Sequence, residues 1–186
     1  PARLVTSFAG VAGTPGTNAI AIRGNSPQFL QWKMEGIEIP NPTHFADVAG
    51  VGGGLFSGLS SQVMGNSDFF NGAFPAEYSN ALFDMSIRNG NNDKFEHAVQ
   101  IGLLGLDFAS EGPINRKTGS SYIFNYRYSA TGLMGAFTEN TGISYQDLTF
   151  KLNFPTRKAG TFSIWGIGLL DMNKDDAVKN HSEWET

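Results

Sequence analysis

"SSYIFNYRYS", residues 120–129, places a large aromatic side chain at every second position. A period of two is typical of a β-strand, because successive side chains of a strand point to opposite faces. The other face carries serines, Asn125 and Arg127, with Ile123 as its only apolar member. The stretch therefore predicts a strand with one aromatic face and one polar face. The aromatic residues are Tyr122, Phe124, Tyr126 and Tyr128.

A second segment, "QDLTFKLNF" (146–154), alternates in the same way. Its polar face includes Lys151, and its apolar face consists of Leu148, Phe150, Leu152 and Phe154. Two further strands are predicted at 94–112, with a bend near residues 102–105, and at 161–170.

Two architectures fit these segments. In a soluble β-sandwich or barrel, the apolar face forms the core and usually mixes aliphatic with aromatic side chains. In a transmembrane β-barrel, the apolar face meets lipid, and aromatic residues form girdles at the two membrane interfaces. The polar face is then free to carry charges, as Arg127 and Lys151 do here. The pattern alone leaves both architectures open.

The first 90 residues have a different style, with short strands and much loop. We predict strands at 18–24, at 28–40 and near 83–87, the second being a single strand or a hairpin bent at Glu35–Gly36. A short helix is compatible with the first residues, and another with residues 55–70. The predicted fold class of this part is α+β.

The composition excludes several classes of site and gives no support to others. The net charge of −4 gives no indication of a nucleic-acid partner, and the absence of cysteine excludes disulfides, thiolate metal sites and a cysteine nucleophile within these 186 residues. Charged residues make up 16 %, below the roughly 25 % of average soluble domains. Low charge with many aromatic residues suits a surface that is not wholly in water. No apolar run reaches 18 residues, so no transmembrane helix is predicted.

The sequence contains only weak candidates for a catalytic or metal-binding site. His44 has Asp47 nearby, but no nucleophile and no further metal ligand lies at a spacing typical of a catalytic or metal site. Glu35 and Glu38 form a carboxylate pair, yet Glu35 belongs to a turn. "GVGGG" (50–54) lacks the Gly-Lys-Ser/Thr ending of a phosphate loop. We therefore expect no enzyme activity, no cofactor and no metal site.

Several stretches taken together resemble TonB-dependent outer-membrane receptors. They include "NAIAIRGNSP", "WKMEGIEIPNPTHF", "GNSDFFNGAFPAEYSNALFDMSIRNGN" and "DLTFKLNFPTRKAGTFSIWGIG". The likeness is greatest to the Bacteroidota branch, which carries a carboxypeptidase-regulatory-like domain ahead of its plug. It implies an α+β plug domain at 1–90, followed at 91–186 by antiparallel transmembrane β-barrel strands, the first of a 22-stranded barrel.

The resemblance also implies roles for individual residues. Arg23 and Arg88 would join the plug to the barrel wall, and the aromatic and leucine faces at 122–128 and 148–154 would meet lipid. The residues that match the plug signature are Gly24, Glu35, Gly36, Pro75, Glu77 and Tyr78.

The implied function is energised uptake of a bulky nutrient, such as a glycan, a peptide or a metal chelate, across the cell outer membrane. The implied partners are TonB of the inner-membrane energising complex and outer-membrane lipid, and the resemblance also allows a SusD-like surface lipoprotein. The alternative is a soluble or surface β-rich ligand-binding module, in which the aromatic faces form an ordinary core.

Overall fold

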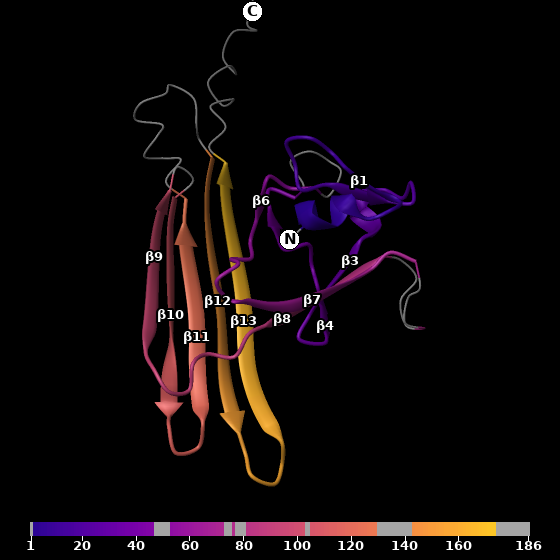
Figure 1. The fold of residues 1–186 in the computed structure, drawn as a ribbon. Coiled ribbons are helices and arrows are strands. Elements are labelled where there is room, and N and C mark those ends of the chain that lie inside the picture. Colours follow the sequence, from indigo (N-terminus) through magenta and orange to yellow (C-terminus); the bar gives the residue numbers. More distant parts are fainter. Residues whose placement is uncertain are drawn as a thin grey trace, which may run out of the picture.

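The structure is a computed structural model that describes residues 2–46, 53–72, 76, 81–102, 105–129 and 143–173. The described residues form mostly antiparallel β-strands with two short 3₁₀-helices (Figure 1). None of them lies in an α-helix, and none belongs to a helix long and apolar enough to cross a membrane. The β-rich part of the fold prediction is confirmed, whereas the α+β class predicted for residues 1–90 finds no α-helix among the described residues.

Short strands build the N-terminal part, by which we mean the described residues up to 88. One sheet has the order β4-β3-β8-β7, with β3 and β8 parallel, and two small pairs, β1-β2 and β5-β6, lie beside it. The elements are η1 (Ala2–Ser7), β1 (Val11–Gly13), β2 (Ile20–Ile22), η2 (Pro27–Phe29), β3 (Gln31–Met34), β4 (Ile37–Ile39), β5 (Thr43–His44), β6 (Phe56–Ser57), β7 (Met64–Phe70) and β8 (Leu82–Ile87).

The short helix with which residues 55–70 are compatible does not form. This stretch contains β6 and β7, and β7 pairs antiparallel with β8. Its sequence "GNSD" (65–68) consists of poor helix formers, whereas Phe69 packs on Phe83 of β8 with ring centroids 4.7 Å apart. The pairing with β8 therefore decides the local structure.

Two tight turns contain residues that match the plug signature, namely Gly24 in one turn and Glu35 and Gly36 in the other. Glu35 and Gly36 join β3 to β4 with φ angles of 51° and 83°, the left-handed conformation that a two-residue type I′ hairpin requires. The hairpin prediction at this point is confirmed. Arg23 and Gly24 have φ angles of 51° and 81° and form a similar turn after β2.

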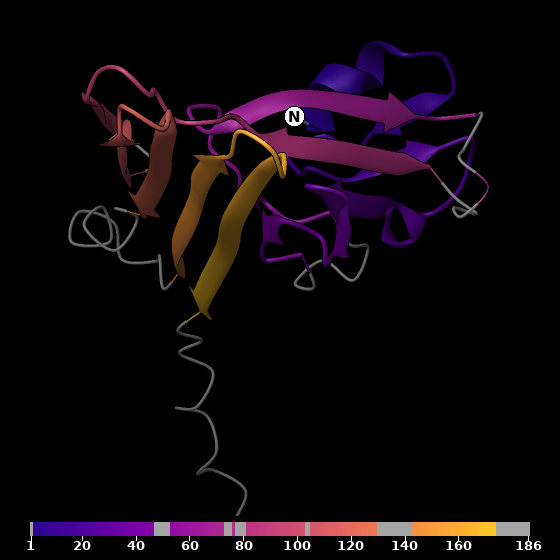
Figure 2. The ribbon, with the colours of Figure 1, turned by 90° about the horizontal axis from the view of Figure 1, so that it is seen from below.

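The second half of the chain forms one antiparallel sheet of five strands in the order β13-β12-β11-β10-β9, which we call the five-stranded sheet. Figures 1 and 2 show β7 and β8 running crosswise to these strands. Consecutive strands are neighbours throughout. The strands are β9 (Glu96–Gly102), β10 (Gly105–Asn115), β11 (Ser120–Tyr128), β12 (Ile143–Pro155) and β13 (Thr161–Asn173).

Three of the four strand predictions hold with small changes of bounds, and one is corrected. The segment 94–112 is a hairpin of β9 and β10 rather than one bent strand, because Gly102 pairs with Gly105 and the chain reverses between them. Gly105 has a φ of 143°, which glycine adopts readily. The strand predicted at 161–170 extends to Asn173 and so includes Asp171.

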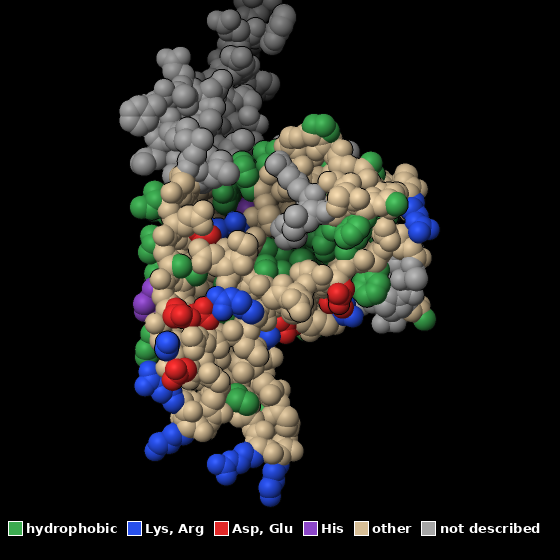
Figure 3. Space-filling view, in the orientation of Figure 1, with side chains coloured by type: hydrophobic (Ala, Val, Ile, Leu, Met, Phe, Trp, Pro, Cys, Tyr) green, Lys and Arg blue, Asp and Glu red, His purple; other side chains and the backbone are tan. Residues whose placement is uncertain are grey.

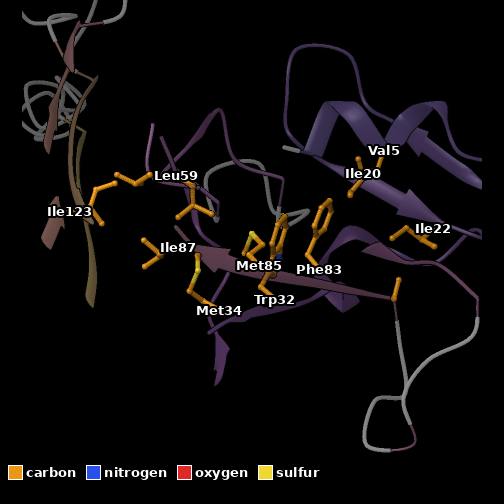
Figure 4. Close-up of a cluster of buried hydrophobic side chains, with 12 residues drawn as sticks. Val5, Ile20, Ile22, Trp32, Met34, Leu59, Phe83, Met85, Ile87 and Ile123 are labelled. Atoms are coloured by element: carbon orange, nitrogen blue, oxygen red, sulfur yellow. The ribbon is translucent and has the colours of Figure 1, made fainter. Parts of the chain in front are cut away.

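The hydrophobic core lies in the N-terminal part and reaches the five-stranded sheet at Ile123, with Trp165 and Ile167 of β13 packed against it. Trp32 of β3 stacks on Phe83 of β8 with ring centroids 5.0 Å apart. Ile123, the only apolar side chain on the polar face of β11, is 1 % exposed and joins this cluster (Figure 4). The buried members are Val5, Ile20, Ile22, Trp32, Met34, Leu59, Val63, Ala81, Phe83, Met85, Ile87 and Ile123.

Ile123→Ala tests this contact. We expect the free energy of unfolding to fall by about 2–5 kcal/mol, because truncation of a buried aliphatic side chain leaves a cavity. Ile101→Ala is the matched control, because Ile101 is 78 % exposed on the same sheet. Urea unfolding of the full-length protein, followed by tryptophan fluorescence, measures both. Equal effects of the two substitutions would contradict the assignment of Ile123 to the core.

Candidate functional site

Over β10, β11 and β12, the five-stranded sheet buries its polar face and exposes its apolar face, whereas the inward residues Trp165 and Ile167 of β13 are apolar. Asn125 is 0 % exposed and Lys151 only 8 %, whereas Leu170 and Ile101 are 65 % and 78 % exposed. Soluble sheets have the opposite arrangement, with apolar side chains inside. Buried polar side chains on the inward face are Glu111, Ser121, Asn125, Asp147, Thr149, Lys151 and Asn153.

The outward face carries a continuous set of apolar side chains. Phe108, Tyr126 and Leu148 lie in one cross-strand row, and Phe108 meets Phe124 edge to face at 5.6 Å. Figure 3 shows hydrophobic side chains along the edge of the molecule that this sheet forms. All eight residues predicted to meet lipid share this face. Tyr126, Tyr128 and Leu148 are exposed, and Tyr122, Phe124, Phe150, Leu152 and Phe154 are half-buried.

A histidine of the N-terminal part lies between two aspartates of the sheet. The side chain of His44 is fully buried, and its Nε2 lies 3.0 Å from Oδ2 of Asp147 on β12. Its Nδ1 bonds to Oδ1 of Asp171 on β13, and the backbone N–H of Phe45 donates to the other oxygen of Asp171 at 2.8 Å. Sequence reasoning had joined His44 only to Asp47, which lies outside the described residues.

Both ring nitrogens of His44 therefore have a carboxylate partner. Arg127 of β11 adds a positive charge to this cluster, since its Nε and Nη2 donate to Asp147 at 2.9 and 2.7 Å and Nη2 also donates to the carbonyl of Ser57. Because both ring nitrogens contact carboxylates, neither is open to a metal ion in this arrangement.

A second ionic contact is made by Lys151, which lies on β12 as Asp147 does. Nζ of Lys151 donates to Oε1 of Glu35 at 2.9 Å and to the carbonyl of Ile87 at 2.8 Å. The N–H of Ile87 in turn donates to Glu35 at 2.6 Å. Glu35 therefore has two tasks, because it forms the β3–β4 turn and also pairs with the sheet.

Arg88 and Arg23, the two arginines predicted to join the plug to the barrel wall, differ in their contacts. Arg88 donates from Nη1 to Oε2 of Glu111 on β10 at 2.7 Å, and its Nε donates to the carbonyl of Gln62. The hydrogen bond to Glu111 raises the pKa of Arg88, against the opposing effect of partial burial. Arg23 is exposed and has no ion pair with any residue that the structure describes.

A cavity of about 860 Å³ separates β9–β11 from part of the N-terminal sheet. Polar side chains line its sheet side, where Asp107 accepts a hydrogen bond from Ser60 at 3.0 Å and also bonds to Asn125. The cavity also borders Arg127 and Gln100. It therefore continues the polar interface beside the His44 cluster.

Several predicted positions cannot be placed. Pro75, Glu77 and Tyr78 lie outside the described residues, as do residues 50–52 of the glycine-rich stretch. Gly24 and Gly36 lie in the two tight turns. As glycines, they have no side chain that could take part in the ionic contacts. Within the described ranges, no three His, Asp or Glu side chains are arranged to hold a metal ion.

Comparison with known proteins adds no relative: the chain matches no protein-family model, no curated protein sequence and no solved structure.

His44→Ala is expected to lower the free energy of unfolding by about 1–3 kcal/mol, because the buried Asp147 loses one of its partners and keeps only Arg127. His97→Ala is the matched control. His97 is exposed on the outward face and contacts Ser110 at 2.9 Å, so its loss should cost little. Urea unfolding of the full-length protein compares the two variants. A small effect of His44→Ala would show that the cluster does not join the two parts.

A double-mutant cycle tests the second ionic contact. Lys151→Met removes the cation and leaves the half-buried Glu35 without its ion pair, so it should destabilise the protein by about 3–5 kcal/mol. Adding Glu35→Gln to that variant should recover much of the loss, since the uncompensated charge disappears. Unfolding free energies of the wild type, both single variants and the double variant give the coupling. A coupling near zero would contradict the contact.

Proposed function

We propose that this chain is part of a TonB-dependent outer-membrane transporter, with residues 1–90 as plug and residues 91–186 as the first strands of its transmembrane barrel. The observation that carries the proposal is the five-stranded sheet, which buries polar side chains on its inward face and exposes apolar side chains on its outward face. Lipid favours an apolar outward face, and a plug inside a barrel favours a polar inward face. A soluble module would expose a large aromatic surface to water for no gain.

Strand length supports the proposal. A transmembrane strand needs about 9–11 residues. The strands β10, β11, β12 and β13 have 11, 9, 13 and 13 residues. The meander of neighbouring antiparallel strands is also the connectivity of such barrels.

The polar interface suits a plug that has to move. Three ionic contacts join the N-terminal part to the sheet, through Asp147 and Asp171, Lys151, and Glu111. Water can replace such contacts when the plug shifts, whereas separating an apolar interface would expose hydrophobic surface. The interface therefore holds the closed state with groups that tolerate hydration.

The transporter would take up a bulky nutrient, such as a glycan, a peptide or a metal chelate, by energised plug rearrangement. TonB would supply the pull from the inner membrane, outer-membrane lipid would surround the strands, and a SusD-like lipoprotein would be an additional partner in this branch. The proposal requires no bond chemistry, cofactor or metal.

Cell fractionation tests the location. We expect the full-length protein in the outer-membrane fraction, in a form whose gel mobility changes on boiling, as a folded barrel unfolds only on heating. Purified in detergent, it should also bind the periplasmic domain of TonB. Recovery from a detergent-free soluble fraction as a folded monomer would overturn the proposal and favour the β-rich ligand-binding module.

Leu148→Arg tests the outward face directly. Leu148 is exposed in the middle of β12, so an arginine there would face lipid and destabilise the folded barrel by about 2–4 kcal/mol. Ala159→Arg, in the exposed turn between β12 and β13, is the matched control and should have little effect. Unfolding in lipid vesicles measures both variants. Tolerance of both would place the outward face in water.

A further inference from the structure

Four basic side chains gather at one end of the five-stranded sheet. Two lie in the turn between β10 and β11 and two in the turn between β12 and β13, and both turns point to the same end (Figure 1). Figure 3 shows Lys and Arg side chains at the tips of these hairpins. The residues are Arg116, Lys117, Arg157 and Lys158, all exposed.

These charges are not neutralised within the described structure. The turns "NRKTGS" (115–120) and "PTRKAG" (155–160) contain no acidic residue. None of the four side chains forms an ion pair with a described residue. The chain as a whole carries a net charge of −4, so this end departs in sign from the rest.

Apolar side chains of the outward face begin directly beside the basic turns. Phe162 lies two residues after Gly160, pairs across strands with Phe154 and is exposed, as is Ile164. Ile114 has the same position before the other turn and is also exposed. Long basic side chains thus border an apolar surface, which is the arrangement that lets their charged ends lie at the level of lipid headgroups.

We propose that the two basic turns bind the phosphate groups of anionic glycerophospholipids, whose acyl chains pack on the exposed apolar side chains beside them. This inference rests on the proposed function, because it needs the outward face to meet a bilayer. Arginine donates two parallel hydrogen bonds to a phosphate, and lysine adds a compact charge. Short barrel turns lie on the periplasmic side, where the leaflet is made of glycerophospholipids, so phosphatidylglycerol is the expected occupant.

The strength of the contact follows from its charge. Each basic residue close to an anionic membrane surface raises binding roughly fivefold at moderate salt. The effect should weaken as ionic strength rises, since the turns are exposed and open to screening. Four such residues on two neighbouring hairpins therefore form a site that distinguishes anionic from zwitterionic lipid.

Native mass spectrometry of the full-length protein, extracted from vesicles of phosphatidylglycerol and phosphatidylcholine, tests the site. We expect phosphatidylglycerol to remain bound preferentially. The variant carrying Arg116→Gln, Lys117→Gln, Arg157→Gln and Lys158→Gln should lose about tenfold or more of that preference. A variant with Arg116→Lys and Arg157→Lys keeps the charge and should retain most of it, and Arg23→Gln, far from these turns, should change nothing.

Two results would overturn the inference: equal retention of the two lipids, or an unchanged preference in the fourfold variant. Both leave the transporter proposal intact if the protein is still found folded in the membrane. Failure of the protein to enter vesicles at all would instead count against the proposed function itself, so the two failures are distinguishable.

Discussion

Burial of a charged sheet face is the constraint on which the rest of the structure depends. An ionised side chain away from water is costly unless it is paired, so each buried charge on the inward face needs a partner. The N-terminal part supplies these partners: His44 for Asp147 and Asp171, Glu35 for Lys151, and Arg88 for Glu111. Their positions determine where the short strands lie against the sheet, and Ile123, Trp165 and Ile167 add apolar contacts.

Local pattern predicted a good part of this fold. The strict alternation in β11 and β12 gave both strands and their two faces, and the Glu-Gly pair gave the β3–β4 turn, because each signal depends only on neighbouring residues. The reversal at Gly102–Gly105 was harder, because a hairpin with so short a turn resembles a bent strand. The short helix considered for residues 55–70 does not form, because pairing with β8, a distant contact, decides the structure there.

The candidate site was mostly beyond sequence reasoning. His44 is 103 residues from Asp147 and 127 from Asp171, and no periodicity links such positions. One signal was present, namely that charged residues such as Asp147 and Lys151 lay on the face opposite the aromatics. An inward charged face requires partners from elsewhere in the chain. In the transporter that we propose, this face is the barrel wall around the plug, the apolar side meets lipid and the basic turns meet headgroups.

Spin-label accessibility is the measurement that tests whether the outward face meets lipid. These 186 residues contain no cysteine, so single labels at Val99, Leu148 and Leu170 would be specific within them. In the full-length protein in native outer membrane, we expect high collision rates with oxygen, which dissolves in lipid, and low rates with a water-soluble nickel chelate. High rates with the nickel chelate at these positions would contradict this expectation.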